Sequence, residues 1–278
     1  MSGTSGDETP RPCRRPVLKV VIFCGGQGVR LREYGRVPQP MIPIGSRPIL
    51  WHVMRYYAHF GHTEFILCLG YGAAAIKEYF LHYKETLSND FVLTDGGRSL
   101  ELAGRDIEDW KITFADTGLH ATIGERLLAA RRYLAGDDVF LATYGDCLTD
   151  APLGDLIRDF TARDAVAGLL SVTPPGTFDL VDQGPDGSVV AIGNVAEGGI
   201  RMNGGFFLLR PSIFDHLGPG EELVVEGFQR LVAEGLLIAY PWDGFWATMD
   251  TLNQHRALEA MNESGRPPWA VWARARGR

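Results

Sequence analysis

Short apolar runs alternate with segments of helical periodicity along most of this 278-residue chain. Apolar runs with the length of buried strands occupy residues 20–24, 65–69, 111–116, 139–144, 165–172 and 205–209. Segments that read as helices, with apolar residues three or four positions apart, cover 49–60, 73–83, 123–133, 153–163 and 223–234. This alternation predicts a Rossmann-like α/β fold, in which helices flank a mixed, mostly parallel sheet.

The segments outside this alternation suggest the domain boundaries. Residues 1–16 are rich in Ser, Gly, Pro and Arg and are expected to form a disordered polar tail. Residues 17–252 are expected to form one domain, with a hairpin around 184–187. Residues 253–278 form a C-terminal extension in which Trp269 and Trp272 are spaced to pack on the domain or at a subunit interface.

The segment with the clearest chemistry follows the first predicted strand. Val20–Phe23 leads into Cys24-Gly25-Gly26-Gln27-Gly28-Val29-Arg30. Glycines let backbone N–H groups approach an anion closely, and an arginine adds a cation, so phosphate binding is one reading. The alternative is a strand-to-helix turn that uses glycine only for its bend. A P-loop is excluded because Gly-Lys-Ser/Thr is absent, and a dinucleotide fingerprint because Leu31 replaces its third glycine.

Two aspartates are candidates for a metal site. Asp146 follows the predicted strand 139–144, at the edge where open α/β sheets bind ligands. Asp250 follows the aromatic, apolar segment 245–249 and could face the same crevice. Two carboxylates together with phosphate oxygens and water suit octahedral Mg²⁺. The alternative is that each aspartate only caps a helix or forms a turn.

Five motifs in order resemble the sugar-1-phosphate nucleotidyltransferases, and within them the glucose-1-phosphate cytidylyltransferase group. The motifs are GGQGVRL at 25–31, PQPMIPIGSRPILWHVM at 38–54, YGD at 144–146, NGGFF at 203–207 and GFWATMDT at 244–251. The resemblance implies transfer of a nucleotidyl group from an NTP, with CTP favoured, to a sugar 1-phosphate, with glucose 1-phosphate favoured. It also implies release of pyrophosphate, Mg²⁺ as cofactor and an inserted β-ribbon in the polar segment 85–110.

The resemblance also implies roles for individual residues. Asp146 and Asp250 would be the metal ligands and, with Arg30, the catalytic residues. The expected nucleotide-binding residues are Gly25, Gly26, Gly28, Val29, Arg30, Gln39, Thr117 and Gly124. The expected sugar-binding residues are Tyr144, Asn194, Asn203 and Gly204.

The chain departs from the family pattern at three of these positions. Val29 stands where the family has threonine, and Gln39 and Asn194 stand where it has lysine. Losing a cation at a phosphate site removes a charge-assisted hydrogen bond worth about 1.5–3 kcal/mol. Two functions therefore remain open: an active transferase, or a relative with weakened or lost catalysis that binds nucleotide or sugar phosphate as a regulatory or partner subunit.

Composition narrows the range of partners. A net charge of −7 argues against nonspecific binding to nucleic acid or anionic membranes. No apolar run approaches the roughly 18 residues of a membrane span, and the four cysteines lack paired ligand spacing. We therefore expect a cytoplasmic protein. The resemblance implies NTP and sugar 1-phosphate as its ligands, and we expect a homo-oligomer.

Overall fold

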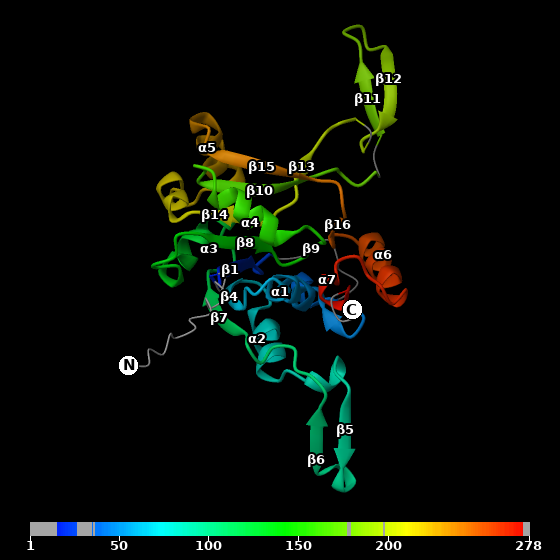
Figure 1. The fold of residues 1–278 in the computed structure, drawn as a ribbon. Helices are drawn as coiled ribbons and strands as arrows, with labels where there is room; N and C mark the ends of the chain where they lie inside the picture. The colour runs from blue at the N-terminus through cyan, green and yellow to red at the C-terminus, as the bar shows by residue number, and fades with distance from the viewer. Residues whose placement is uncertain (1–15, 27–34, 36, 177–178, 197, 275–278) are drawn as a thin grey trace, which may run out of the picture.

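A mixed sheet forms the centre of the computed structural model, which describes residues 16–26, 35, 37–176, 179–196 and 198–274 (Figure 1). Its strands are β1 (Lys19–Phe23), β4 (Glu64–Leu69), β7 (Lys111–Asp116), β8 (Phe140–Tyr144), β10 (Ala167–Val172), β13 (Met202–Asn203), β14 (Phe207–Leu209) and β15 (Leu237–Trp242). They lie in the order β13-β10-β14-β8-β1-β4-β7, and β15 pairs with β10. Strands β8, β1, β4 and β7 are parallel, whereas β14 is antiparallel to β8 and β10. This confirms the predicted α/β fold.

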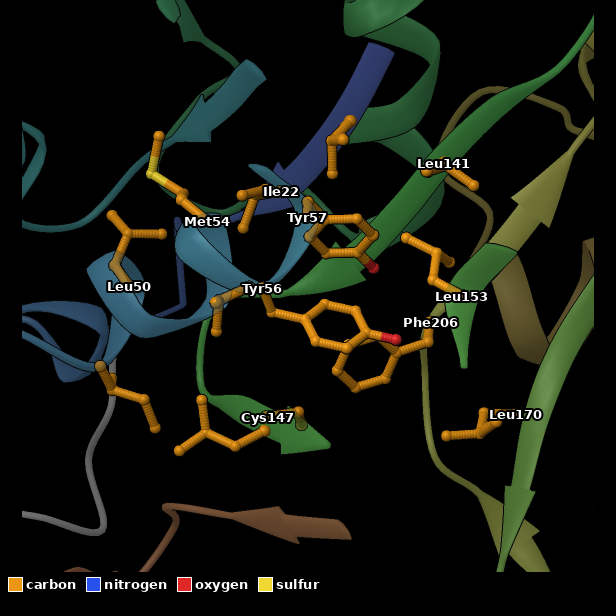
Figure 2. Close-up of a cluster of buried hydrophobic side chains, with 14 of the residues drawn as sticks. Ile22, Leu50, Met54, Tyr56, Tyr57, Leu141, Cys147, Leu153, Leu170 and Phe206 are labelled. Atoms are coloured by element: carbon orange, nitrogen blue, oxygen red, sulfur yellow. The ribbon is translucent and has the colours of Figure 1, made fainter. Parts of the chain in front are cut away.

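Helices cover both faces of the sheet. They are α1 (Ile49–His59), α2 (Ala73–Leu81), α3 (Ile123–Ala130), α4 (Leu153–Thr161), α5 (Phe228–Glu234), α6 (Leu252–Glu263) and α7 (Val271–Arg274). Alternate residues of β1 point to opposite faces, so Val20 and Ile22 join one core cluster while Val21 joins the other. The first cluster contains buried residues of α1, α2, α4 and α6, and Figure 2 shows part of it. The second contains residues of α3 and α5.

Short paired strands complete the body beside the sheet. Strand β2 (Pro43–Ile44) pairs with β3 (Arg47–Pro48), and β9 (Cys147–Thr149) pairs with β16 (Trp246–Thr248). The predicted helix 223–234 begins as one π-helical turn, Leu223–Gly227, before α5. None of the helices in the described ranges is long and apolar enough to cross a membrane.

Two hairpins project from opposite ends of the molecule (Figure 1). The first arm consists of β5 (Phe91–Thr94) and β6 (Ser99–Leu102), and the second of β11 (Asp179–Gln183) and β12 (Val189–Asn194). The first confirms the β-ribbon expected in 85–110, and the second confirms the hairpin expected around 184–187.

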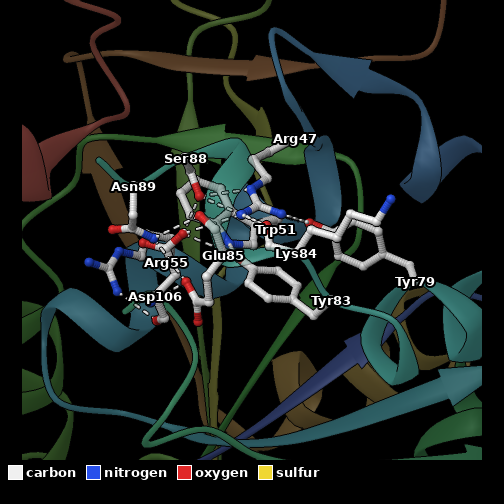
Figure 3. Close-up of polar contacts among 10 residues, drawn as sticks. All are labelled: Arg47, Trp51, Arg55, Tyr79, Tyr83, Lys84, Glu85, Ser88, Asn89 and Asp106. Atoms are coloured by element: carbon white, nitrogen blue, oxygen red, sulfur yellow. Dashed lines mark hydrogen bonds and ion pairs between the residues drawn. The ribbon is translucent and has the colours of Figure 1, made fainter. Parts of the chain in front are cut away.

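A buried ion pair connects the first arm to the body (Figure 3). The guanidinium of Arg47 lies 3.5 Å from the Asp106 carboxylate, and the two side chains are 2% and 6% exposed. Arg47 also donates to Ser88 Oγ, to the Tyr79 hydroxyl at 3.2 Å and to the Lys84 carbonyl at 2.8 Å. These bonds satisfy a charge that would otherwise be costly to bury, and they fix the segments on both sides of the arm.

Candidate active site

The parallel strands β1 and β8 bring the first site residues together. Phe23 is in register with Tyr144, so Cys24–Gly26 and Gly145–Asp146 leave the sheet side by side. The Gly145 amide donates to the Phe23 carbonyl at 3.2 Å. A Cβ on Gly145 would lie 3.3 Å from Cys24 Sγ, so this close approach favours glycine.

The two predicted metal ligands do meet, through the small sheet of β9 and β16. Thr248 pairs with Cys147, and the Met249 amide donates to the Asp146 carbonyl at 3.1 Å. Asp146 and Asp250 flank this contact. Gln39 Nε2 lies 2.6 Å from Asp146 Oδ2 and 3.3 Å from Asp250 Oδ1, which places both carboxylates around one amide group.

The electrostatics of this carboxylate pair, Asp146 and Asp250, favour a bound cation. Burial, followed by the negative charge of Asp250, raises the pKa of Asp146 to about 6, although hydrogen bonds from Cys147 and Gln39 act in the opposite direction. Within the described part of the chain, no three His, Cys, Asp or Glu residues gather as a metal cluster. The donor set therefore suits Mg²⁺, which commonly takes one or two protein carboxylates and completes its shell with phosphate and water oxygens.

The glycine-rich segment is described only at its start. Gly25 is buried and Gly26 is exposed. The predicted contacts of Gly28, Val29 and Arg30 lie outside the described residues. A Cβ on Gly25 would lie 2.1 Å from Nη1 of Arg126, so a side chain at this position would displace that guanidinium.

Arg126 is not among the predicted site residues, although it contacts two of them, Gly25 and Thr117. Its guanidinium donates to the Gly25 carbonyl at 3.1 Å, the Leu69 carbonyl at 3.2 Å, the Gly118 carbonyl at 3.0 Å and Thr117 Oγ1 at 2.7 Å. Arg126 is 3% exposed, and its bonds to Gly25, Leu69 and Gly118 tie together the ends of β1, β4 and β7. The sequence did carry a signal, because an arginine on the apolar face of a helix needs buried acceptors.

Thr117 and Gly124 lie near Arg126 with different surroundings. Thr117 accepts from Arg126 and donates to the Leu69 carbonyl at 2.8 Å, so it belongs to the same network. Gly124 lies in the first turn of α3, where a Cβ would come within 2.2 Å of the Glu221 carbonyl oxygen. Close packing therefore accounts for this glycine, and its contact with nucleotide stays a prediction.

Three of the four predicted sugar residues gather beside the carboxylate pair. Burial raises the pKa of Tyr144 to about 12, although a side-chain interaction with Asn203 acts in the opposite direction. The Asn203 side chain accepts from the Gly205 amide at 2.9 Å, and Trp246 Nε1 donates to the Gly204 carbonyl at 2.8 Å. These bonds shape a turn in which two residues have positive φ, +75° for Gly205 and +50° for Phe206.

Asn194 is placed differently, at the base of the second arm. Its side chain donates to the Gly176 carbonyl at 3.0 Å and accepts from the Ala196 amide at 2.9 Å. These bonds close the base of the hairpin. The sugar contact expected of Asn194 stays a prediction.

Sequence comparison decides the family. The glucose-1-phosphate cytidylyltransferase of Salmonella typhi is 37% identical over 258 residues, which cover 92% of this chain and 100% of that protein. The chain belongs to the sugar-1-phosphate nucleotidyltransferase family. A probable glucose-1-phosphate cytidylyltransferase of Bacillus subtilis is 36% identical with the same coverage. No family model matches the sequence.

Solved structures agree with this family membership at the level of the fold. A putative glucose-1-phosphate thymidylyltransferase from Bacillus anthracis superposes with a TM-score of 0.65 at 16% identity, covering 87% of this chain and 94% of that one. A UTP-bound UGPase from Acinetobacter baumannii also gives 0.65, at 18% identity, with 94% and 98% covered. The predicted family and fold class are therefore both confirmed.

Proposed function

We propose that this enzyme transfers the cytidylyl group of CTP to glucose 1-phosphate, giving CDP-glucose and pyrophosphate. The full-length match to relatives that carry this activity in their names supports the proposal most strongly. Because those relatives are transferases, the match favours an active enzyme over the binding-only alternative. The meeting of Asp146 with Asp250 supports the same conclusion from the structure.

The residues of the site suit an in-line displacement. A phosphate oxygen of glucose 1-phosphate attacks the α-phosphorus of CTP, the bond to the bridging oxygen of pyrophosphate breaks, and no covalent enzyme intermediate is needed. Catalysis then depends on positioning and on charge stabilisation. Asp146 and Asp250 would hold Mg²⁺, which neutralises phosphate charge when bound. Arg126 keeps the start of the glycine-rich segment in place, and Asn203 and Tyr144 would contact the sugar hydroxyls.

A substrate screen tests this function. Pyrophosphate release is measured for CTP, UTP, dTTP, GTP and ATP, each with several sugar 1-phosphates and Mg²⁺. We expect the highest kcat/KM for CTP with glucose 1-phosphate, and Asp250→Asn serves as the inactive control. A clear preference for another pair would reassign the substrate, and no release with any pair would contradict the transferase function.

We also propose that the enzyme is a homo-oligomer that forms through its arms. An isolated two-stranded hairpin is at best marginally stable in water. Nevertheless, the first arm leaves Phe91, Val92, Leu93 and Leu100 between 43% and 58% exposed, and the second exposes Val189, Val190 and Ile192. Exposed apolar side chains gathered on projecting strands are typical of interaction surfaces, and a second copy would cover them.

Light scattering coupled to gel filtration tests the assembly. The double variant Leu93→Asp with Leu100→Asp should reduce the mass to that of a smaller species. Val232→Asp is the matched control, because Val232 is 56% exposed but lies on α5, in the body. A monomeric wild type, or a double variant with unchanged mass, would overturn the proposal.

A further inference from the structure

Gln39 lies on a stiff piece of backbone beside the carboxylate pair. It begins a single 3₁₀ turn, Gln39–Met41, with Pro38 before it and Pro40 as its second residue. The Met41 amide donates to the Pro38 carbonyl at 2.8 Å, and the Ile42 amide donates to the Gln39 carbonyl at 3.1 Å. The prolines fix the φ angles on both sides of Gln39, which restricts the backbone that carries its side chain.

The amide nitrogen of Gln39 faces three oxygen acceptors. Besides the contacts with Asp146 and Asp250, Nε2 lies 2.7 Å from the Met249 carbonyl oxygen. Two N–H bonds are therefore shared among three oxygens, and two of these oxygens belong to the carboxylate pair. This geometry orients both carboxylates toward the same point.

The charge of Gln39 matters as much as its position. A glutamine side chain is neutral, so it leaves the full negative charge of the two carboxylates in place. Within the parts of the chain that the structure describes, no Lys or Arg forms an ion pair with either aspartate. Among the described residues, a divalent ion that approaches the pair therefore displaces uncharged donors rather than a fixed cation.

We propose that Gln39 sets the metal affinity of this site: it orients Asp146 and Asp250 without neutralising them, so that the enzyme binds a divalent ion before nucleotide. This inference rests on the proposed function, because it takes the carboxylate pair as the metal site. It gives Gln39 a role in metal binding in addition to the nucleotide contact that the sequence predicts.

Direct metal binding tests the inference without any turnover. Mn²⁺ is titrated into nucleotide-free protein, and free Mn²⁺ is measured by electron paramagnetic resonance. Gln39→Lys places a cation on the pair and should weaken binding at least tenfold. Gln39→Met is of similar size and removes the orienting amide without adding a charge, so its affinity should fall between those of wild type and Gln39→Lys. Asp146→Asn should abolish tight binding.

Two further measurements separate the effect of charge from a loss of folding. Gln39→Glu adds a carboxylate and should bind Mn²⁺ at least as tightly as wild type, and circular dichroism confirms that each variant is folded. Equal affinities for the lysine, methionine and glutamate variants, with Asp146→Asn still impaired, would overturn the role of Gln39 but leave the metal site standing. If the wild type binds no Mn²⁺ at millimolar concentration and matches Asp146→Asn, both the inference and the metal assignment fail.

Discussion

At the residue scale, the buried carboxylate of Asp146 lowers the stability of the metal-free protein. Its pKa is raised to about 6 in the folded protein, against 3.8 as the ordinary value. A raised pKa means that folding favours the protonated carboxyl over the ionised one. The contribution of this carboxyl to the stability of the folded protein is therefore fully present below pH 3.8 and is lost as the pH rises through 6. At pH 7.5, without metal, the ionised carboxylate therefore costs about 2–3 kcal/mol.

Asp146→Asn should consequently lose metal-dependent turnover and yet stabilise the metal-free protein. We expect a rise of a few degrees in Tm at pH 7.5 in EDTA, since 1 kcal/mol corresponds to about 2–4 °C in proteins of this size. The difference from wild type should shrink at pH 4.5, where the wild-type carboxyl is protonated. A lower Tm for the variant at pH 7.5 would contradict the charge argument.

His52 is a second residue whose protonation affects folding. Its Nε2 contacts the Ile44 carbonyl oxygen at 3.1 Å, and its Nδ1 accepts from Trp269 Nε1 at 3.3 Å, so the neutral ring satisfies both contacts. Burial is the main cause that lowers the pKa of His52 from 6.5 to about 4. Its contribution to stability is present above pH 6.5 and is lost as the pH falls toward 4, up to about 3 kcal/mol.

Urea denaturation at several pH values checks this. Between pH 6.5 and 4, the free energy of unfolding of His52→Leu should depend on pH less steeply than that of wild type. The difference between the two slopes should correspond to the binding of up to one proton on unfolding. His82→Gln is the control, because the His82 side chain is 69% exposed and should leave the slope unchanged. Equal slopes for wild type and His52→Leu would rule out this role.

At the scale of elements, the buried pair of Arg47 and Asp106 should hold the first arm in place. Arg47→Ala leaves the Asp106 carboxylate buried without its cation, which costs about 3–5 kcal/mol. Hydrogen exchange should accelerate in residues 84–106 more than in the sheet. Arg105→Ala is the matched control, because it breaks an exposed pair with Glu108 that is worth less than about 1 kcal/mol. Uniform acceleration throughout the protein would instead indicate a global role.

The elements that the sequence predicted share a strong local pattern. Strand β7 has the predicted bounds, and α1 ends one residue earlier than predicted, because their apolar positions follow a single period. Strand β15 was missed: it pairs only with β10, contains Pro241 and has no fully buried side chain, so its pattern is weak. Helix α6 was missed because it buries only His255 and Leu258, although its capping box, Thr251 with Gln254, was a readable start signal.

The site was less predictable than the elements because its contacts join distant parts of the chain. Asp146 and Asp250 could be named from their motifs, but their meeting depends on the pairing of β9 with β16, which no local pattern encodes. For the same reason, the sequence associated Gln39 with phosphates, whereas the structure places its amide on the carboxylates. Arg126 binds carbonyls from three separate segments. Every residue has a backbone carbonyl, so the residue types at these positions do not reveal the acceptors.

For the whole molecule, the C-terminal extension contributes a side chain to the main hydrophobic core. Trp269 is 1% exposed and packs against His52 and Phe245 in the cluster that includes β1. Trp269→Ala should therefore cost about 3–5 kcal/mol and lower the Tm of the entire protein in a single transition. Trp272→Ala, at a half-buried position, should cost less. A separate early transition with an unchanged main Tm would show that the extension unfolds independently.

The pairing of β9 with β16 also sets when, during synthesis, Asp146 and Asp250 can first meet. Gln39 and Asp146 leave the ribosome well before Asp250, so the nascent chain can assemble β1, β4, β7 and β8 while it still holds one carboxylate of the pair. Domains form as their residues emerge. A chain terminated before residue 250 would thus contain Asp146 but not Asp250, the second predicted metal ligand. If these two carboxylates hold the metal, divalent-ion binding by newly made protein would report that translation had passed residue 250.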